Sequence, residues 1–80
     1  MEESILKQLE QKLYKNYKSL SSGYMFIEIY DGIIVLNWTT QNDLNINYYR
    51  VNQIINYMKK YLIKQNQEGF IYTATNCIKL

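Results

Sequence analysis

The stretch Tyr24–Thr39, YMFIEIYDGIIVLNWT, consists of two alternating apolar runs on either side of Asp31-Gly32. An Asp-Gly pair between two such runs is a strong local signal for a β-hairpin with a two-residue type I′ turn. Because this turn fixes the strand register, it predicts a set of directly opposed pairs. These are Tyr30–Ile33, Ile29–Ile34, Ile27–Leu36, Met25–Trp38 and Tyr24–Thr39.

The two faces of this predicted hairpin differ in composition. Side chains alternate along a strand, so one face collects only apolar residues: Met25, Ile27, Ile29, Ile34, Leu36 and Trp38. The opposite face mixes polar and large apolar side chains: Tyr24, Phe26, Glu28, Tyr30, Ile33, Val35, Asn37 and Thr39. We expect the first face to be core. The second is unusually aromatic for a surface in contact with water.

Two helices are predicted around the hairpin. The first covers Glu2–Leu20, where apolar residues recur at spacings of three and four: Leu6, Leu9, Leu13, Tyr17 and Leu20. The second runs from Asn45 to Gln65, with its stripe at Tyr48, Val51, Ile55, Met58 and Leu62. Its N-cap is one of Asp43, Asn45 and Asn47, of which we favour Asn45.

A third strand is predicted at Phe70–Thr75, after Gln67-Glu68-Gly69 ends the second helix. The sequence leaves open which face of this strand is inward, because Phe70, Tyr72 and Ala74 compete with Ile71, Thr73 and Cys77. The order α-β-β-α-β gives one α+β domain over residues 1–80. A right-handed crossover favours a three-stranded, mainly antiparallel sheet of order 2-1-3 with both helices on the Met25 face. With one helix on each face instead, Tyr24, Phe26 and Val35 would be internal.

The composition excludes several kinds of site. The chain has 80 residues, a net charge of +2, no histidine and one cysteine, Cys77, so neither a disulfide within the chain nor a zinc site is expected. We expect no metal and no cofactor. The carboxylates Glu28, Asp31 and Asp43 form no pair with the spacing of a catalytic dyad, and nothing near Cys77 in sequence would activate it. The sequence therefore predicts a protein that is not an enzyme.

The sequence also favours a cytoplasmic location without membrane association. It has no apolar run of about 18 residues, and Met1–Lys18 lacks the apolar core of a signal peptide. Isoleucine, asparagine, lysine and tyrosine dominate, which indicates an AT-rich gene of the kind found in low-GC bacteria and their phages and plasmids.

The mixed hairpin face is the leading candidate for function. Its large side chains form a candidate protein-binding site: Tyr24, Phe26, Tyr30, Ile33 and Val35. An apolar patch of this size is covered by something, either the second helix, the C-terminal tail Asn76–Leu80, a second copy or another protein. We therefore expect a small non-catalytic protein-binding module, with a homodimer as one form. Its profile fits a phage- or plasmid-encoded inhibitor or modulator of a host protein such as a defence nuclease.

The alternative is an accessory nucleic-acid-binding protein. The outer side of the second helix interleaves basic, amide and aromatic residues: Tyr49, Arg50, Gln53, Tyr57, Lys60 and Lys64. Tyrosines can stack on bases and lysines can neutralise phosphates. Because the net charge is only +2, we expect such binding to be weak.

Overall fold

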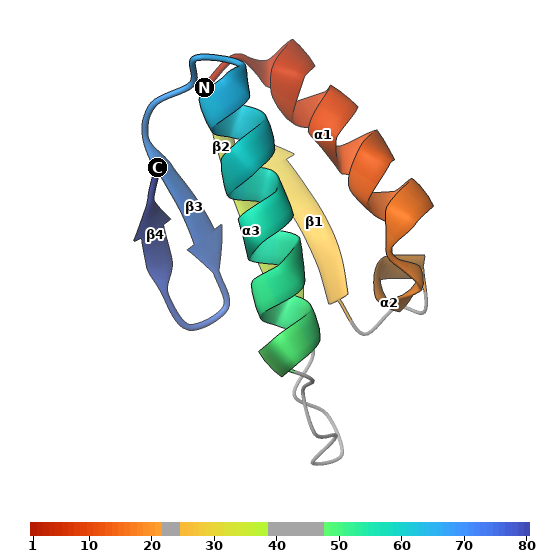
Figure 1. Cartoon of the computed structure of the whole chain (residues 1–80). Coiled ribbons are helices and arrows are strands. Elements are labelled where there is room, and N and C mark those ends of the chain that lie inside the picture. Colours follow the sequence, from red (N-terminus) through yellow and green to blue (C-terminus); the bar gives the residue numbers. More distant parts are fainter. Residues whose placement is uncertain (22–24, 39–47) are drawn as a thin grey trace.

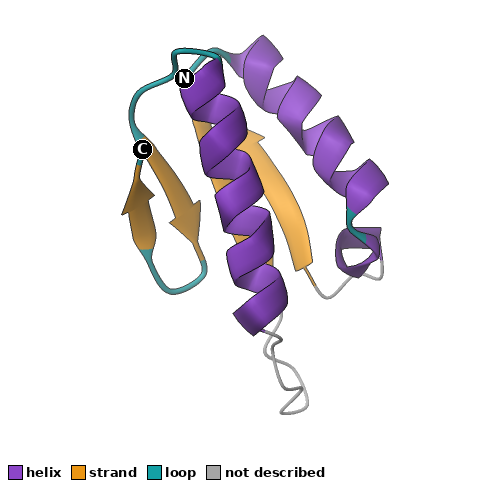
Figure 2. Ribbon diagram, viewed as in Figure 1, coloured by secondary structure: helices purple, strands orange, loops and turns teal. Residues whose placement is uncertain are grey.

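The computed structural model describes residues 1–21, 25–38 and 48–80 (Figure 1). The elements in chain order are α1 (Glu3–Asn16), α2 (Lys18–Ser21), β1 (Met25–Tyr30), β2 (Ile33–Trp38), α3 (Tyr48–Lys64), β3 (Phe70–Thr73) and β4 (Cys77–Lys79). The two long helices, α1 and α3, lie on the same face of the sheet (Figure 2). The described part of the chain places no helix on the other face.

The hairpin has the predicted register. Pairs from Met25–Trp38 to Tyr30–Ile33 are directly opposed, whereas the Tyr24–Thr39 pair lies outside the described residues. Asp31 and Gly32 have φ values of 52° and 71°, as the type I′ turn requires. The N-terminal amine of Met1 donates to the Gly32 carbonyl at 2.8 Å, which joins the chain start to the turn.

The sheet order differs from the prediction. Four strands follow the order β1-β2-β3-β4, and β3 is parallel to β2 rather than antiparallel to β1. Seen from the helices, β1 lies on one flank of β2, and a right-handed crossover through α3 moves the chain to the other flank (Figure 1). The predicted order 2-1-3 was therefore wrong. With the helices on this face, a right-handed crossover places β3 on the side of β2 that is opposite to β1.

The C-terminal residues form a strand rather than a free tail. Thr73 anchors a tight turn: its Oγ1 accepts the Asn76 backbone N–H at 2.9 Å, and its own backbone N–H donates to the Asn76 carbonyl at 2.8 Å. The chain then reverses, and β4 pairs antiparallel with β3 through Phe70–Lys79, Ile71–Ile78 and Tyr72–Cys77. The predicted strand Phe70–Thr75 therefore ends at Thr73, and a fourth strand that the sequence analysis missed closes this side of the sheet.

The core lies between the helices and the predicted apolar face of the hairpin. Residues from every layer are buried: Leu6, Leu9, Leu13 and Leu20; Val51, Ile54, Met58 and Leu62; Met25, Ile27, Ile34, Leu36, Trp38 and Ile71. On α3 the stripe is rotated relative to the prediction, because Ile54 is fully buried while Ile55 is half-buried and Tyr48 is exposed.

The first helix is shorter than the predicted Glu2–Leu20. It ends at Asn16, and Tyr17 has an extended backbone with φ −126° and ψ 107° before the short α2 begins. This break places the Tyr17 ring edge-on to Tyr57, with 5.9 Å between ring centroids, and the turn that follows carries Leu20 into the core. The end of α1 therefore coincides with a contact between Tyr17 and Tyr57 of α3.

The second predicted helix corresponds to α3. Its candidate caps Asp43, Asn45 and Asn47 lie outside the described residues. At the other end Asn66, with φ 57°, takes the left-handed position, and the Gln67 and Asn66 N–H groups donate to the carbonyls of Leu62 and Ile63. These two hydrogen bonds form a C-terminal cap, which ends the helix before the predicted break at Gln67-Glu68-Gly69.

Candidate functional site

The face of the sheet opposite to the helices, called the open sheet face from here on, combines residues from all four strands. They are Phe26, Glu28, Tyr30, Ile33, Val35, Asn37, Phe70, Tyr72, Cys77 and Lys79. Four members of the predicted protein-binding set lie on it together: Phe26, Tyr30, Ile33 and Val35. The fifth, Tyr24, lies outside the described residues.

Strand register arranges this face in rows. One row runs Glu28, Val35, Tyr72, Cys77 from β1 to β4. The next row runs Tyr30, Ile33, Phe70, Lys79. Ile33 and Phe70 are at the same level because each directly precedes a member of the β2–β3 pair Ile34–Ile71. The two central strands therefore carry only aliphatic and aromatic side chains in these rows, and the charged side chains lie on the outer strands.

The aromatic side chains of the open sheet face are accessible. Tyr30 is 52% exposed, Phe70 41% and Tyr72 38%, whereas Phe26, Ile33 and Val35 are half-buried between their strand neighbours. A sheet face in contact with water usually alternates to polar residues. The central strands do not follow that rule on this side.

Two polar side chains of this face, Asn37 and Glu28, are hydrogen-bonded to each other. Asn37 Nδ2 donates to Glu28 Oε1 at 3.3 Å, and Asn37 Oδ1 accepts the Trp38 backbone N–H at 3.0 Å. A flat partner could therefore cover the centre of the face without separating these groups from their acceptors, which keeps the desolvation cost low.

Sequence reasoning missed the part of this face that β3 supplies. Phe70 and Tyr72 point away from the helices because Ile71 between them is fully buried beside Ile34 of β2. The usable signal was Ile71, a β-branched residue whose chain neighbours are both aromatic. Parallel pairing with β2 places it in the core and both rings on the open side.

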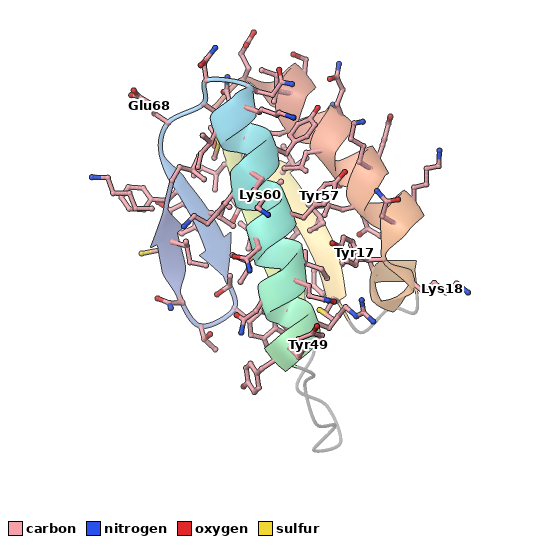
Figure 3. All side chains as sticks on the ribbon, viewed as in Figure 1. Tyr17, Lys18, Tyr49, Tyr57, Lys60 and Glu68 are labelled. Atoms are coloured by element: carbon pink, nitrogen blue, oxygen red, sulfur yellow. The ribbon has the colours of Figure 1, made fainter. Side chains whose placement is uncertain are left out.

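A second surface lies between α1 and α3, where three tyrosines meet basic side chains. Tyr17 and Tyr57 lie side by side between the two helices, and Lys60 points outward from α3 (Figure 3). Arg50 Cζ lies 6.0 Å from the centroid of the Tyr17 ring, and Lys12 Nζ lies 5.9 Å from that of Tyr61. Both separations lie at the outer limit, about 6 Å, of cation–π attraction.

This tyrosine groove is formed by two adjoining depressions. One of ≈ 530 Å³ is lined by Tyr57, Lys60, Tyr61, Ile63 and Lys64. The other, of ≈ 350 Å³, is lined by Tyr17, Arg50, Gln53, Asn56, Tyr57 and Lys60. The described residues that line them include three cations, Arg50, Lys60 and Lys64, and no carboxylate.

Most of the predicted nucleic-acid set lines this groove. Arg50, Gln53, Tyr57, Lys60 and Lys64 do so, and Arg50 Nη1 donates to Gln53 Oε1 at 2.8 Å. Tyr49 is 71% exposed near the start of α3 and lines neither depression. Sequence reasoning missed Lys12, Tyr17 and Tyr61. Tyr17, which directly follows α1, and Tyr61 of α3 could have been found from the apolar stripes that they border, whereas Lys12 of α1 lines neither depression and only approaches the Tyr61 ring.

Within the described ranges, no group of three or more His, Cys, Asp or Glu side chains could hold a metal ion. Cys77 is exposed at the outer strand of the open sheet face. None of the helices in these ranges is long and apolar enough to cross a membrane.

Comparisons of this chain with family models, with curated proteins and with solved structures found no match.

Proposed function

We propose that this chain is a non-catalytic protein-binding module and that the open sheet face is its docking surface. The observation that carries the proposal is the placement of both long helices on one side of a four-stranded sheet. Phe70, Tyr72 and Tyr30 are left accessible on the other side.

The size of the apolar patch supports this proposal. A large aromatic side chain can bury about 150–250 Å², so three partly exposed rings with Phe26, Ile33 and Val35 offer on the order of 500 Å². Patches of roughly 300–600 Å² are the largest on ordinary monomers and often have a function. Aromatic residues are also the ones enriched at the centres of protein interfaces.

A charge placed at the centre of the open sheet face tests the proposal. Val35→Glu introduces a carboxylate where a partner must exclude water, and Gln11→Glu introduces the same charge on the exposed side of α1 as a control. The tagged chain is used to isolate its partner, a second copy or another protein, from host extract, and binding of the purified partner is then titrated by calorimetry. We expect the Kd to rise at least about 100-fold for Val35→Glu and less than about twofold for the control.

Equal loss or equal retention of binding by the two variants would exclude the open sheet face as the docking surface. Identification of the purified partner also tests the sequence-based prediction that it is a host protein such as a defence nuclease.

A second candidate function is the binding of single-stranded nucleic acid in the tyrosine groove. It is favoured by a set of cations over tyrosine rings with no carboxylate among the described lining residues. Fluorescence anisotropy with a labelled oligothymidine should show affinity that falls steeply between low and moderate salt. Lys60→Glu with Lys64→Glu should abolish this binding, whereas Lys7→Glu with Lys79→Glu, which lie outside the groove, should weaken it far less. Absence of binding at low salt would remove this candidate.

A further inference from the structure

We infer that the occupant of the open sheet face is the same face of a second copy of this chain. The inference rests on the proposed function, because it needs this face to be a docking surface. The two sheets stack about a twofold axis that lies between them, runs along the strands and passes between β2 and β3. Such an axis places β2 of each copy over β3 of the other, and β1 over β4.

Side-chain size is self-complementary about this axis. β2 contributes the aliphatic residues Ile33 and Val35, and β3 contributes the rings of Phe70 and Tyr72 at the same levels. The twofold axis therefore sets Val35 against Tyr72 of the second copy and Ile33 against its Phe70. Each contact occurs twice, and each pairs a ring with a smaller branched side chain, which suits close packing of two faces.

Charge is complementary on the flanks. Glu28 of β1 lies in the row of Cys77, one row from Lys79 of β4. When β1 of one copy covers β4 of the other, Lys79 of the second copy faces Tyr30 and its long side chain reaches the Glu28 carboxylate. The same contact forms on the opposite flank by symmetry, so both unlike charges of the face are used.

A twofold axis that runs across the strands through the row of Val35 gives a poorer match. It would set Glu28 against Glu28 of the second copy and Tyr72 against Tyr72. Like charges brought together at an interface are unfavourable. The charges therefore select the axis along the strands.

The available area predicts a weak dimer. About 500 Å² per copy gives on the order of 1,000 Å² in total, at the lower end of specific interfaces. We expect a dissociation constant of roughly tens of micromolar, with the monomer dominant in dilute solution.

Charge reversal tests the flank contacts by sedimentation equilibrium. Glu28→Lys sets two cations together on each flank, and Lys79→Glu sets two carboxylates together. Each single change should raise the dimer Kd at least about tenfold, and the combination of both should return it to within about threefold of the parent. Lys7→Glu on the exposed side of α1 should leave the Kd unchanged. Single changes without effect, or a combination that is no better than either one, would overturn this geometry.

A crosslink tests the register independently of the charges. Glu28→Cys lies about 14 Å from Cys77 in its own chain, three strand spacings away, which is too far for an intrachain disulfide. It faces Cys77 of the second copy across stacked sheets about 10 Å apart, a separation too long for a disulfide but within reach of a short bismaleimide, so this reagent should give a covalent dimer on a denaturing gel. The additional change Cys77→Ser should abolish that dimer. Gln11→Cys, with Cys77 intact, should crosslink at least about tenfold more slowly.

The two levels of the proposal fail in different ways. A parent chain that stays monomeric at millimolar concentration, together with no crosslink from Glu28→Cys, overturns the homodimer. If Val35→Glu then still loses a partner that Gln11→Glu retains, the docking surface stands and the occupant is a different protein. If Val35→Glu also loses nothing, both levels are wrong.

Discussion

Both faces of β2 carry aliphatic side chains, yet the surroundings of these side chains differ. Ile34 and Leu36 are fully buried beneath the helices, while Ile33 and Val35, one residue away, are half-buried on the open side. Their hydrophobicity is similar. What differs is that the buried stripes of α1 and α3 both lie against the same face. The apolar character of a strand thus does not reveal which face its own chain covers, whereas the placement of the helical stripes does.

A single aspartate on either face gives the largest expected contrast. Ile34→Asp buries a charge without a partner, which should cost more than about 4 kcal/mol and unfold a domain of this size. Val35→Asp lies on the open side and should cost less than about 1.5 kcal/mol when protein is dilute enough to be monomeric. Urea unfolding followed by circular dichroism separates the two. An unfolded Val35→Asp variant would mean that the face is internal.

The turn between β1 and β2 fixes the strand register, which determines which residues lie on the buried face and which on the open face. A change that disrupts this turn therefore tests the difference between the two faces. Gly32→Val places a β-branched residue at φ 71° and sets its Cβ 2.9 Å from the Met1 carbonyl oxygen. We expect a loss of about 2–3 kcal/mol in unfolding free energy from backbone strain and from displacement of Met1. Asp31→Asn should stay within about 0.5 kcal/mol, since asparagine tolerates positive φ. Parent-like stability of Gly32→Val would exclude the type I′ turn.

A side chain of α1 covers part of the outer edge of β1, because the Ile27 backbone N–H donates to Tyr14 Oη at 3.1 Å. Tyr14→Phe removes that acceptor and should lower stability by about 1 kcal/mol. Hydrogen exchange gives the local measurement: protection of the Ile27 amide should fall more than that of the Leu36 amide. Equal loss at both amides would indicate that the change acts on the whole sheet and not on this bond.

The smallest expected contrast compares one methylene on each face. Ile34→Val should cost about 1 kcal/mol, because it opens space in a filled core. Ile33→Val should cost less than about 0.5 kcal/mol in the monomer, where the lost group meets water. Calorimetric unfolding at two protein concentrations makes the comparison sharper, since the cost of Ile33→Val should grow with concentration if this face binds a second copy. A cost that is the same at both concentrations would contradict that.

Local patterns predicted the hairpin because Asp31-Gly32 and the alternation around it act over a few residues. The register, the turn type and the core face are all confirmed. The sheet order was beyond such patterns. It depends on which flank of β2 the crossover reaches, and that follows from combining strand handedness with the position of the helices.

The remaining differences have a common cause in contacts that are distant in sequence. The helix break at Tyr17 accompanies its contact with Tyr57, forty residues away by number (57 − 17 = 40). The strand Cys77–Lys79 contains a cysteine and a lysine and has only three residues, so it is recognisable only once β3 is in place to pair with it. For the candidate site, four residues of the hairpin could be predicted from alternation, but Phe70 and Tyr72 required knowledge of which side Ile71 takes.

The central position of β2 also has a kinetic consequence. Its contacts with β1 close a loop of two residues, while Ile34 meets Ile71 across 37 positions (71 − 34 = 37). Loop-closure entropy favours the local pairing, so the hairpin is expected to form in the folding transition state before the parallel pairing follows on it. During that interval the edge of β2 that later receives β3 is unpaired, and newly made chains at high concentration are most exposed to strand exchange and aggregation at this step.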